Sequence, residues 1–415
     1  MPASPSTARA INDRLALRLL QQEGPLTAGQ LKQLTGLSRP TVADLVERLT
    51  ASALITVVGE AGEQRRGPNA KLYGIVADRA HLAALDVRTE GVSVIVSDLL
   101  GRVLAEASVP IADDTGTGPA VEQAVTMVER VAKEAGADRL HTVGIGAPGL
   151  IDPATGELRD SSGLPEWHRR LVAALQERLP EARVSVDNET NLAAVAEQRD
   201  GAARDRDTFV LLWLGHGTGA AVVLDGALRR GASGGTGEIG FLPVPGTTAL
   251  PSATDCEGGF HSLAGSAAIV ELAREHGVTV EGTAHEPAAA GVVRAAVARV
   301  VGAAGEAGAV PTRAGIAVPE AGSAARFLDA LADRLAVGVA SVVAILDPGC
   351  LVLGGEVGQA GGDELAGRVA ERVRRMSPLP TEVRASALGG GAVLRGALLT
   401  ARDGAQDDLF APPER

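Results

Sequence analysis

Four apolar segments of the chain each run directly into glycines or into a cluster of carboxyl and amide side chains. They are "HTVGIGAPGLIDPATGEL", "ARVSVDNETNLAAVAEQ", "LLWLGHGTGAAVVLDGALRRGASGGTGEIGF" (211–241) and "CLVLGGEVG". Helical spans separate them, and strands that alternate with helices indicate an α/β architecture. Because α/β proteins bind ligands where strands end, the sequence predicts a ligand site at these ends.

The first 77 residues predict a different, smaller unit. A four-residue spacing of Ile11, Leu15 and Leu19 predicts the inward stripe of a first helix. Thr27 and Gln30 form a capping pattern for a second helix, with Leu31 and Leu34 facing inward and Gly36 in the turn that follows. The third helix is predicted to have Ser38 as its cap, Pro40 in its first turn, and an inward face made of Val42, Leu45, Val46 and Leu49.

Two short helices joined by a glycine-containing turn are typical of a helix-turn-helix, and the apolar runs Leu54–Val58 and Leu72–Ile75 predict a β-hairpin wing. A winged helix-turn-helix presents the start of its recognition helix to base edges and its wing to the phosphate backbone. The predicted DNA-binding residues are Arg39, Thr41, Asp44 and Arg48 on the helix and Arg65, Arg66 and Lys71 on the wing.

Charge supports this assignment of DNA binding to residues 1–77. The chain carries a formal net charge of −12, but these residues hold nine Lys/Arg against six Asp/Glu, which leaves −15 on the remainder. A basic head on an acidic body places nucleic-acid contact in the head. The alternative is a small helical module that contacts another protein.

The segments "GIGAPGLIDPATG", "VDNETNLAAVAE", "LGHGTGAAVVLDGALRRGASGGTGEIG" and "LVLGGEVG" resemble, in order and spacing, the ROK family of repressors, open reading frames and sugar kinases. The winged helix ahead of them resembles the family's repressor branch. The resemblance implies a two-lobed actin/hexokinase-like fold, with residues 78–200 in the first lobe, 201–391 in the second, and a helix near 392–402 returning to the first. Family kinases bind sugar and ATP in the cleft, and family repressors commonly bind a sugar or sugar phosphate and release DNA.

The chain departs from the family pattern at the ATP site. Family kinases carry Asp-x-Gly-Gly-Thr, whereas "DVRTEG" keeps Asp86 but has Arg88, Thr89 and Glu90 where Gly, Gly and Thr are expected. These side chains obstruct the close backbone approach that a polyphosphate needs, and Glu90 adds a negative charge. Gly215, Gly217 and Gly219 are therefore interpreted as a vestigial phosphate loop, and we expect no ATP cofactor.

The catalytic position of the family is also altered. The family's base is the Asp of Asn-Asp-x-Asn, and "NETN" places Glu189 there between the retained Asn188 and Asn191. A displacement of about 1 Å can cost on the order of 100-fold in rate, so no catalytic residue is predicted. The expected ligand contacts are Asn188, Glu189, Glu238 and Gly149. The alternative for Asn188 is a structural helix cap.

No metal site is expected either. The family's structural zinc uses a His and a cysteine cluster, but Phe241 replaces the His and only Cys256 remains, with Ser262 near the position of a sugar-contacting Glu. A tetrahedral zinc needs four ligands, so the remaining alternative is a makeshift site of Cys256, His261 and carboxylates.

These features together predict a DNA-binding transcriptional regulator, a repressor of carbohydrate genes, that senses a sugar or sugar phosphate without catalysis. Its expected partners are double-stranded operator DNA and a second copy in a homodimer or a tetramer. Only two cysteines occur and no apolar run approaches about 20 residues, so a cytoplasmic location without membrane contact is expected. The alternatives are a regulator whose larger domain is only a dimerisation scaffold, and an ATP-dependent sugar kinase.

Overall fold

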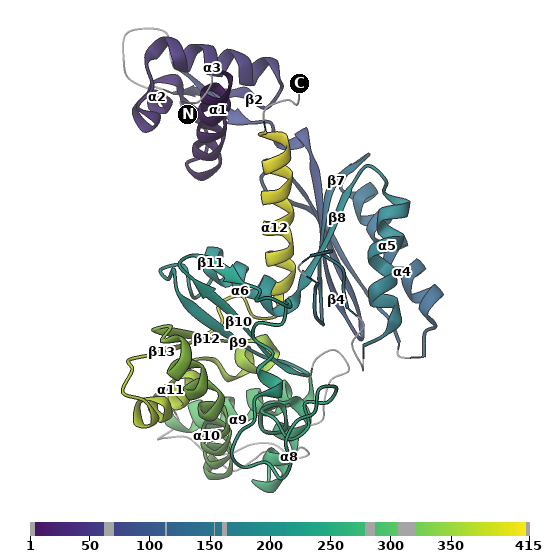
Figure 1. Cartoon of the computed structure of the whole chain (residues 1–415), viewed down its shortest axis with the longest axis vertical. Helices are drawn as coiled ribbons and strands as arrows, with labels where there is room; N and C mark the ends of the chain where they lie inside the picture. Colours follow the sequence, from purple (N-terminus) through teal and green to yellow (C-terminus); the bar gives the residue numbers. More distant parts are fainter. Residues whose placement is uncertain are drawn as a thin grey trace.

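The computed structural model describes residues 5–61, 70–112, 114–152, 154–159, 164–278, 287–305 and 321–411. Three sheets organise this part of the chain: one of three strands near the amino terminus and two of five strands. Figure 1 shows them as a small head, a first lobe and a second lobe. The mixed α/β prediction and the order of the predicted units are confirmed.

The head is a winged helix-turn-helix. Its helices are α1 (Pro5–Gln22), α2 (Ala28–Thr35) and α3 (Arg39–Ala51), and its sheet has the order β1 (Leu26–Thr27), β3 (Ala70–Ile75), β2 (Ile55–Ala61). The predicted capping box is present, since the Thr27 hydroxyl accepts from the Gln30 N–H and the Gln30 side chain accepts from the Thr27 N–H. Gly36 ends α2 with a φ of 72°, and Ser38 caps α3.

Three predicted inward positions of the head are wrong. Ile11 is 59% exposed and Leu15 39% exposed, while Ala16, Leu17 and Leu20 of α1 are buried. A strict four-residue spacing drifts around a helix of 3.6 residues per turn, so the stripe of Ile11, Leu15 and Leu19 cannot stay on one buried face. On α2, Leu31 is buried as predicted, but Leu34 is 51% exposed because so short a helix inserts only one turn into the core.

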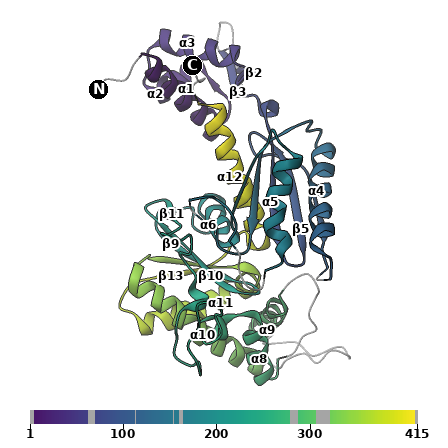
Figure 2. The same cartoon turned by 45° about the vertical axis from the view of Figure 1, so that its right-hand side comes forward.

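The first lobe is built on the sheet β6-β5-β4-β7-β8. Its strands are β4 (His81–Arg88), β5 (Gly91–Asp98), β6 (Val103–Pro110), β7 (Leu140–Ala147) and β8 (Arg183–Asn188), and η1 (Ala77–Arg79) precedes them. Helices α4 (Thr117–Glu134) and α5 (Glu166–Arg178) cover one face, and α12 (Ala392–Leu409) packs on β4 and β7 from the other (Figure 2). Since β4, β7 and β8 are parallel, their carboxyl ends meet at one edge.

The second lobe is built on the sheet β11-β10-β9-β12-β13. Its elements are β9 (Phe209–Leu214), β10 (Thr218–Leu224), β11 (Ala227–Arg229), η2 (Ile239–Phe241), α7 (His261–Ala264), α8 (Ser266–Glu275), α9 (Ala288–Gly305), α10 (Ala321–Leu346), β12 (Cys350–Gly354), α11 (Gly355–Met376) and β13 (Glu382–Ala385). Leu212, Leu214, Leu351 and Leu353 of the central strands belong to the same buried cluster as apolar residues of α8 to α11.

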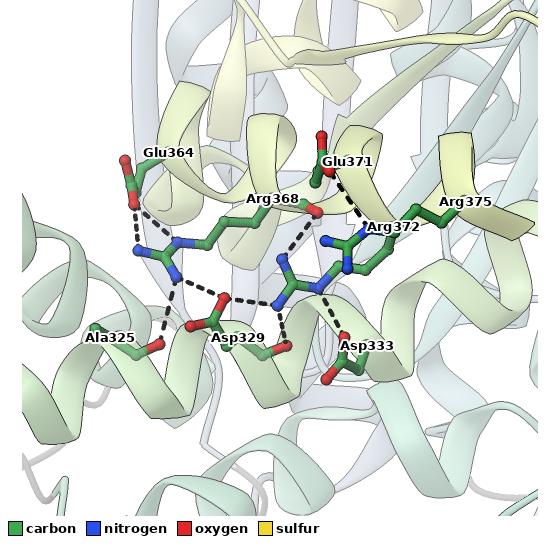
Figure 3. A network of polar contacts seen from close by, with 8 residues as sticks. All are labelled: Ala325, Asp329, Asp333, Glu364, Arg368, Glu371, Arg372 and Arg375. Carbon is green, nitrogen blue, oxygen red and sulfur yellow. Dashed lines mark hydrogen bonds and ion pairs between the residues drawn. The ribbon is translucent and has the colours of Figure 1, made fainter.

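Two arginines of α11 tie that helix to α10. Arg372 donates to Asp329 at 2.6 Å and to Asp333 at 2.7 Å, while Arg368 lies 2.8 Å from Asp329 and 2.6 Å from Glu364. Figure 3 shows these guanidinium groups side by side over one carboxylate. The network fixes the register of the two longest helices of the second lobe and leaves both arginines committed to this contact.

The lobes are joined by two crossing segments that meet at a buried carboxylate. One is α6 (Glu189–Asp200) with the turn after it, and the other is the stretch from Ser386 through η3 (Gly389–Gly391) into α12. Glu197 is fully buried and accepts from the N–H groups of Ala202, Ala387 and Leu388 and from the Ser386 hydroxyl. One side chain therefore holds both crossings together.

Helix α12 continues from these crossings to the head (Figures 1 and 2). Near its start Gly396 packs directly on the backbone of Leu192 in α6, and near its end Asp407 pairs with Arg14 of α1. Phe410 is buried in the same apolar cluster as Leu17 and Leu20 of the head. None of the described helices is long and apolar enough to cross a lipid bilayer.

Candidate functional site

The junction of β8 and α6 gathers three of the predicted ligand residues. Asn188 caps α6, accepting from the N–H groups of Thr190 at 2.9 Å and Asn191 at 3.3 Å. Its amide group donates to the carbonyl of Gly149 at 3.0 Å and to the carboxyl of Glu189 at 2.8 Å. The structural alternative for Asn188 is confirmed, and the cap also sets the position of Glu189.

The carboxyl groups here lie in an environment that disfavours their charged form. Burial raises the pKa of Glu189 to about 8, with further increases from the charges of Asp86 and Glu238. Burial also raises the pKa of Glu238. At neutral pH a protonated Glu189 can donate a hydrogen bond to a ligand hydroxyl but cannot accept its proton as an ionised base would.

This pKa predicts how stability depends on pH. The folded-state pKa of Glu189, about 8, lies above its ordinary value of 4.5. The contribution of Glu189 to stability is thus complete below pH 4.5 and lost as the pH rises through 8. Because glutamine cannot ionise, Glu189→Gln should raise the Tm relative to the original chain at pH 9 and leave it nearly unchanged at pH 5. Thermal melts across this range measure the difference, with the exposed Glu157→Gln as control; a Tm difference independent of pH would contradict the pKa.

The glycines between β9 and β10 form a tight turn, in which the N–H of Gly215 donates to the carbonyl of Gly217 at 3.1 Å. A side chain at Gly215 would meet the Trp213 indole nitrogen at 2.8 Å and a Glu356 carboxylate oxygen at 3.0 Å, whereas Gly217 faces open space. An internal carboxylate therefore stands against the turn that is interpreted as a phosphate loop.

Arg88 meets that carboxylate from the first lobe. Its guanidinium donates to Asp86 through Nε at 3.0 Å and Nη2 at 2.9 Å, to Glu356 through Nη1, and to the carbonyl of Gly390 at 3.3 Å. Burial raises the pKa of Asp86, and the neighbouring Arg88 opposes that increase. Sequence reasoning identified Arg88 only as an obstruction and missed Glu356, although a charged residue inside "LGGEVG" was a visible signal.

A separate cavity of about 360 Å³ lies between β7, β8, α6 and α12. Its polar lining includes Asp152, Ser185, Asp187, Arg230 and Thr400. Arg230 donates to Asp187 at 2.5 Å across the cavity edge. None of the predicted ligand residues lines it, although Asp187 of its lining accepts from the N–H of Asn188 at 2.9 Å.

The residues at which the sequence predicts that the family's zinc site has been lost lie beside η2 and α7. Cys256 is half-buried, burial raises the pKa of its thiol, and burial lowers the pKa of His261. Within the described ranges, no group of three or more His, Cys, Asp or Glu side chains is arranged to hold a metal ion. The expectation of no metal stays a prediction.

The predicted DNA-binding residues occupy different situations in the head. Arg39 is the exposed first residue of α3, and Thr41 shares a 2.8 Å hydrogen bond with the Ser38 cap. Arg48 is engaged by Asp13 of α1 at 2.6 Å and by Asp44, so it ties two helices of the head together. Lys71 is exposed on β3. Arg65 and Arg66 lie outside the described residues.

Comparisons with known proteins agree with this architecture. The chain is 26% identical over 244 residues to the N-acetylglucosamine repressor of Shigella flexneri (57% of this chain and 58% of that protein). It is 23% identical over 247 residues to the xylose repressor of Bacillus subtilis strain 168 (58% and 62%). Each match thus spans less than two thirds of the repressor.

Two solved structures share the fold. A ROK family transcriptional regulator, described as a homolog of the E. coli MLC protein, superposes with a TM-score of 0.72 at 20% identity, covering 97% of this chain and 98% of that one. The ROK hexokinase from Thermus thermophilus gives 0.58 at 27% identity, covering 79% and 99%. The sequence profile of the ROK family matches residues 82–403. By this match the chain belongs to the ROK family.

Proposed function

We propose that this chain is a DNA-binding transcriptional regulator of carbohydrate genes, acting as a repressor whose cleft senses a sugar or sugar phosphate. The observation that carries the proposal is a winged helix with an open, basic start of α3 joined to a ROK domain. The repressors of N-acetylglucosamine and xylose genes among its relatives support the assignment to carbohydrate genes.

In this proposal the start of α3 enters the major groove of operator DNA. Arg39 and Thr41 lie at the end of the recognition helix that approaches base edges in such motifs. Lys71, on the wing, would neutralise a backbone phosphate. A homodimer would present two such heads to a palindromic site.

Arg39→Ala should weaken operator binding by about 1–3 kcal/mol, which is roughly 5- to 150-fold in Kd, because a base-reading contact is lost. Lys71→Ala should weaken binding to specific and to nonspecific DNA equally, and it should reduce the dependence of the Kd on salt concentration. Gel shifts or fluorescence anisotropy with the promoter next to the gene measure both. Arg178→Ala, which removes an exposed arginine of the first lobe, is the matched control; equal Kd values for Arg39→Ala and the control would refute the proposed interface.

We propose that the effector contacts Asn188, Glu189, Glu238 and the backbone at Gly149. A thermal-shift screen of N-acetylglucosamine, xylose, glucose and their phosphates tests this, since a ligand at 100 times its Kd adds about 2.7 kcal/mol to the folded state. Loss of the shift in Glu238→Ala would support the site. Operator binding without any sugar-dependent shift would instead favour a regulator whose ROK domain serves as a dimerisation scaffold.

We further propose that the domain is catalytically silent, works without ATP or zinc, and acts in the cytoplasm. Two features support catalytic silence. The raised pKa of Glu189 leaves little ionised base at neutral pH. The ion pair of Arg88 with Glu356 places a carboxylate beside the glycine turn where a phosphate would bind. Sugar phosphorylation that disappears in Glu189→Gln would overturn this part and leave the DNA-binding proposal standing.

A further inference from the structure

Arg88 and Glu356 come from different lobes and meet between them. Arg88 ends β4 of the first lobe, and Glu356 is the second residue of α11 in the second lobe. Their side chains are 27% and 11% exposed, and the Asp86 carboxylate that shares the guanidinium is 7% exposed. Because water is largely excluded from this contact, it is screened less than a surface ion pair.

The same guanidinium also reaches the segment about which the lobes would move. Arg88 donates to the carbonyl of Gly390, whose own N–H donates to Gln359 of α11 at 3.0 Å. Arg88 thus contacts the first lobe, the second lobe and the crossing segment at once. Separation of the lobes cannot occur without breaking its bond to Glu356.

The surroundings of Glu356 within the second lobe are equally constrained. Its carboxylate lies against Gly215 and beside the indole nitrogen of Trp213, which is 8% exposed. The Glu356 carboxylate and the Trp213 indole nitrogen therefore both border the space next to Gly215. Because Trp213 in β9 and Glu356 in α11 both belong to the second lobe, Arg88 is the group that would withdraw when the lobes part, which would open the surroundings of both side chains to solvent.

We propose that the Arg88–Glu356 ion pair is an internal latch that holds the two lobes closed in the absence of any ligand. Arg88 is held in position by Asp86 of its own lobe. Its bond to Glu356 is the contact that breaks when the lobes part. The inference concerns lobe closure alone and stands independently of the proposed DNA binding.

The test is a double-mutant cycle on the full-length chain with Arg88→Gln, Glu356→Gln and the double variant. Two readouts report closure: the radius of gyration from small-angle X-ray scattering, and acrylamide quenching of Trp213 in a Trp167→Phe background, which leaves one tryptophan. Arg178→Gln, which breaks an ion pair within the first lobe, is the matched control. Circular dichroism verifies that each variant is folded.

The latch predicts that each single variant increases the radius of gyration and at least doubles the quenching constant of Trp213, whereas the control changes neither. The double variant should open no further than Glu356→Gln alone, since the same contact is already lost. Unchanged scattering and quenching in the single variants would overturn the proposal, as would strictly additive effects in the double variant. Arg88→Gln leaves Asp86 unpaired and could fail to fold for that reason. In that case the result for Glu356→Gln, in which Arg88 still pairs with Asp86, decides whether the proposal holds.

Discussion

Glu197→Ala is expected to lower the free energy of unfolding by about 3–5 kcal/mol, because several buried N–H groups lose their acceptor together. The Glu197 carboxylate accepts four hydrogen bonds, among them those from Ala202 and Leu388 at 2.6 Å and 3.0 Å. These donors belong to the two segments that cross between the lobes. Urea denaturation measures the decrease in the free energy of unfolding. In a thermal melt of the variant, the lobes should separate at a lower temperature than that at which each lobe unfolds.

Glu197→Gln is a graded version of the same experiment. The amide keeps one acceptor oxygen but turns an NH₂ group toward backbone N–H donors. The decrease in the free energy of unfolding should therefore lie between zero and that of Glu197→Ala. Glu275→Ala, an exposed position on α8, is the matched control and should stay within about 0.5 kcal/mol. An unfolding midpoint for Glu197→Ala equal to that of the control would show that the crossings are held by something else.

Gly396→Ala has the second large expected effect, a loss of about 1–3 kcal/mol or more from overpacking. A methyl group at this position would lie 1.9 Å from the carbonyl oxygen of Leu192, so α12 and α6 would have to separate. The same substitution at Gly404, farther along α12, meets nothing within 4 Å and should stabilise the helix by about 0.5–1 kcal/mol. Two identical changes in one helix should therefore shift the urea midpoint in opposite directions; shifts of the same sign would refute the close contact.

The parts of the structure that follow from local chemistry could be predicted from the sequence. The capping box of Thr27 and Gln30, the cap at Ser38 and the buried face of α3 are each set by residues a few positions apart, and all are confirmed. The strand ends with glycines and amides were likewise readable, because an apolar run followed by a breaker needs no distant partner.

The parts that depend on distant partners could not be predicted. Arg88 and Glu356 are 268 positions apart, and no pattern in the sequence joins them. Arg48 looked like an outward DNA contact because the periodicity of α3 leaves it unburied, but Asp13 on another helix engages it. The stripe on α1 failed for a different reason, since a strict four-residue spacing drifts around the helix and leaves Ile11 and Leu15 exposed.

Helix α12 has a mechanical consequence for the position of the head relative to the lobes. Its 18 residues, Ala392–Leu409, span about 27 Å at 1.5 Å per residue. As a stiff lever, it would turn a tilt of about 10° at the lobe junction into a displacement of roughly 5 Å at its far end. In the proposed homodimer, the two recognition helices would have to keep about 34 Å between half-sites, so a swing of that size would put the two heads out of phase with the turns of duplex DNA.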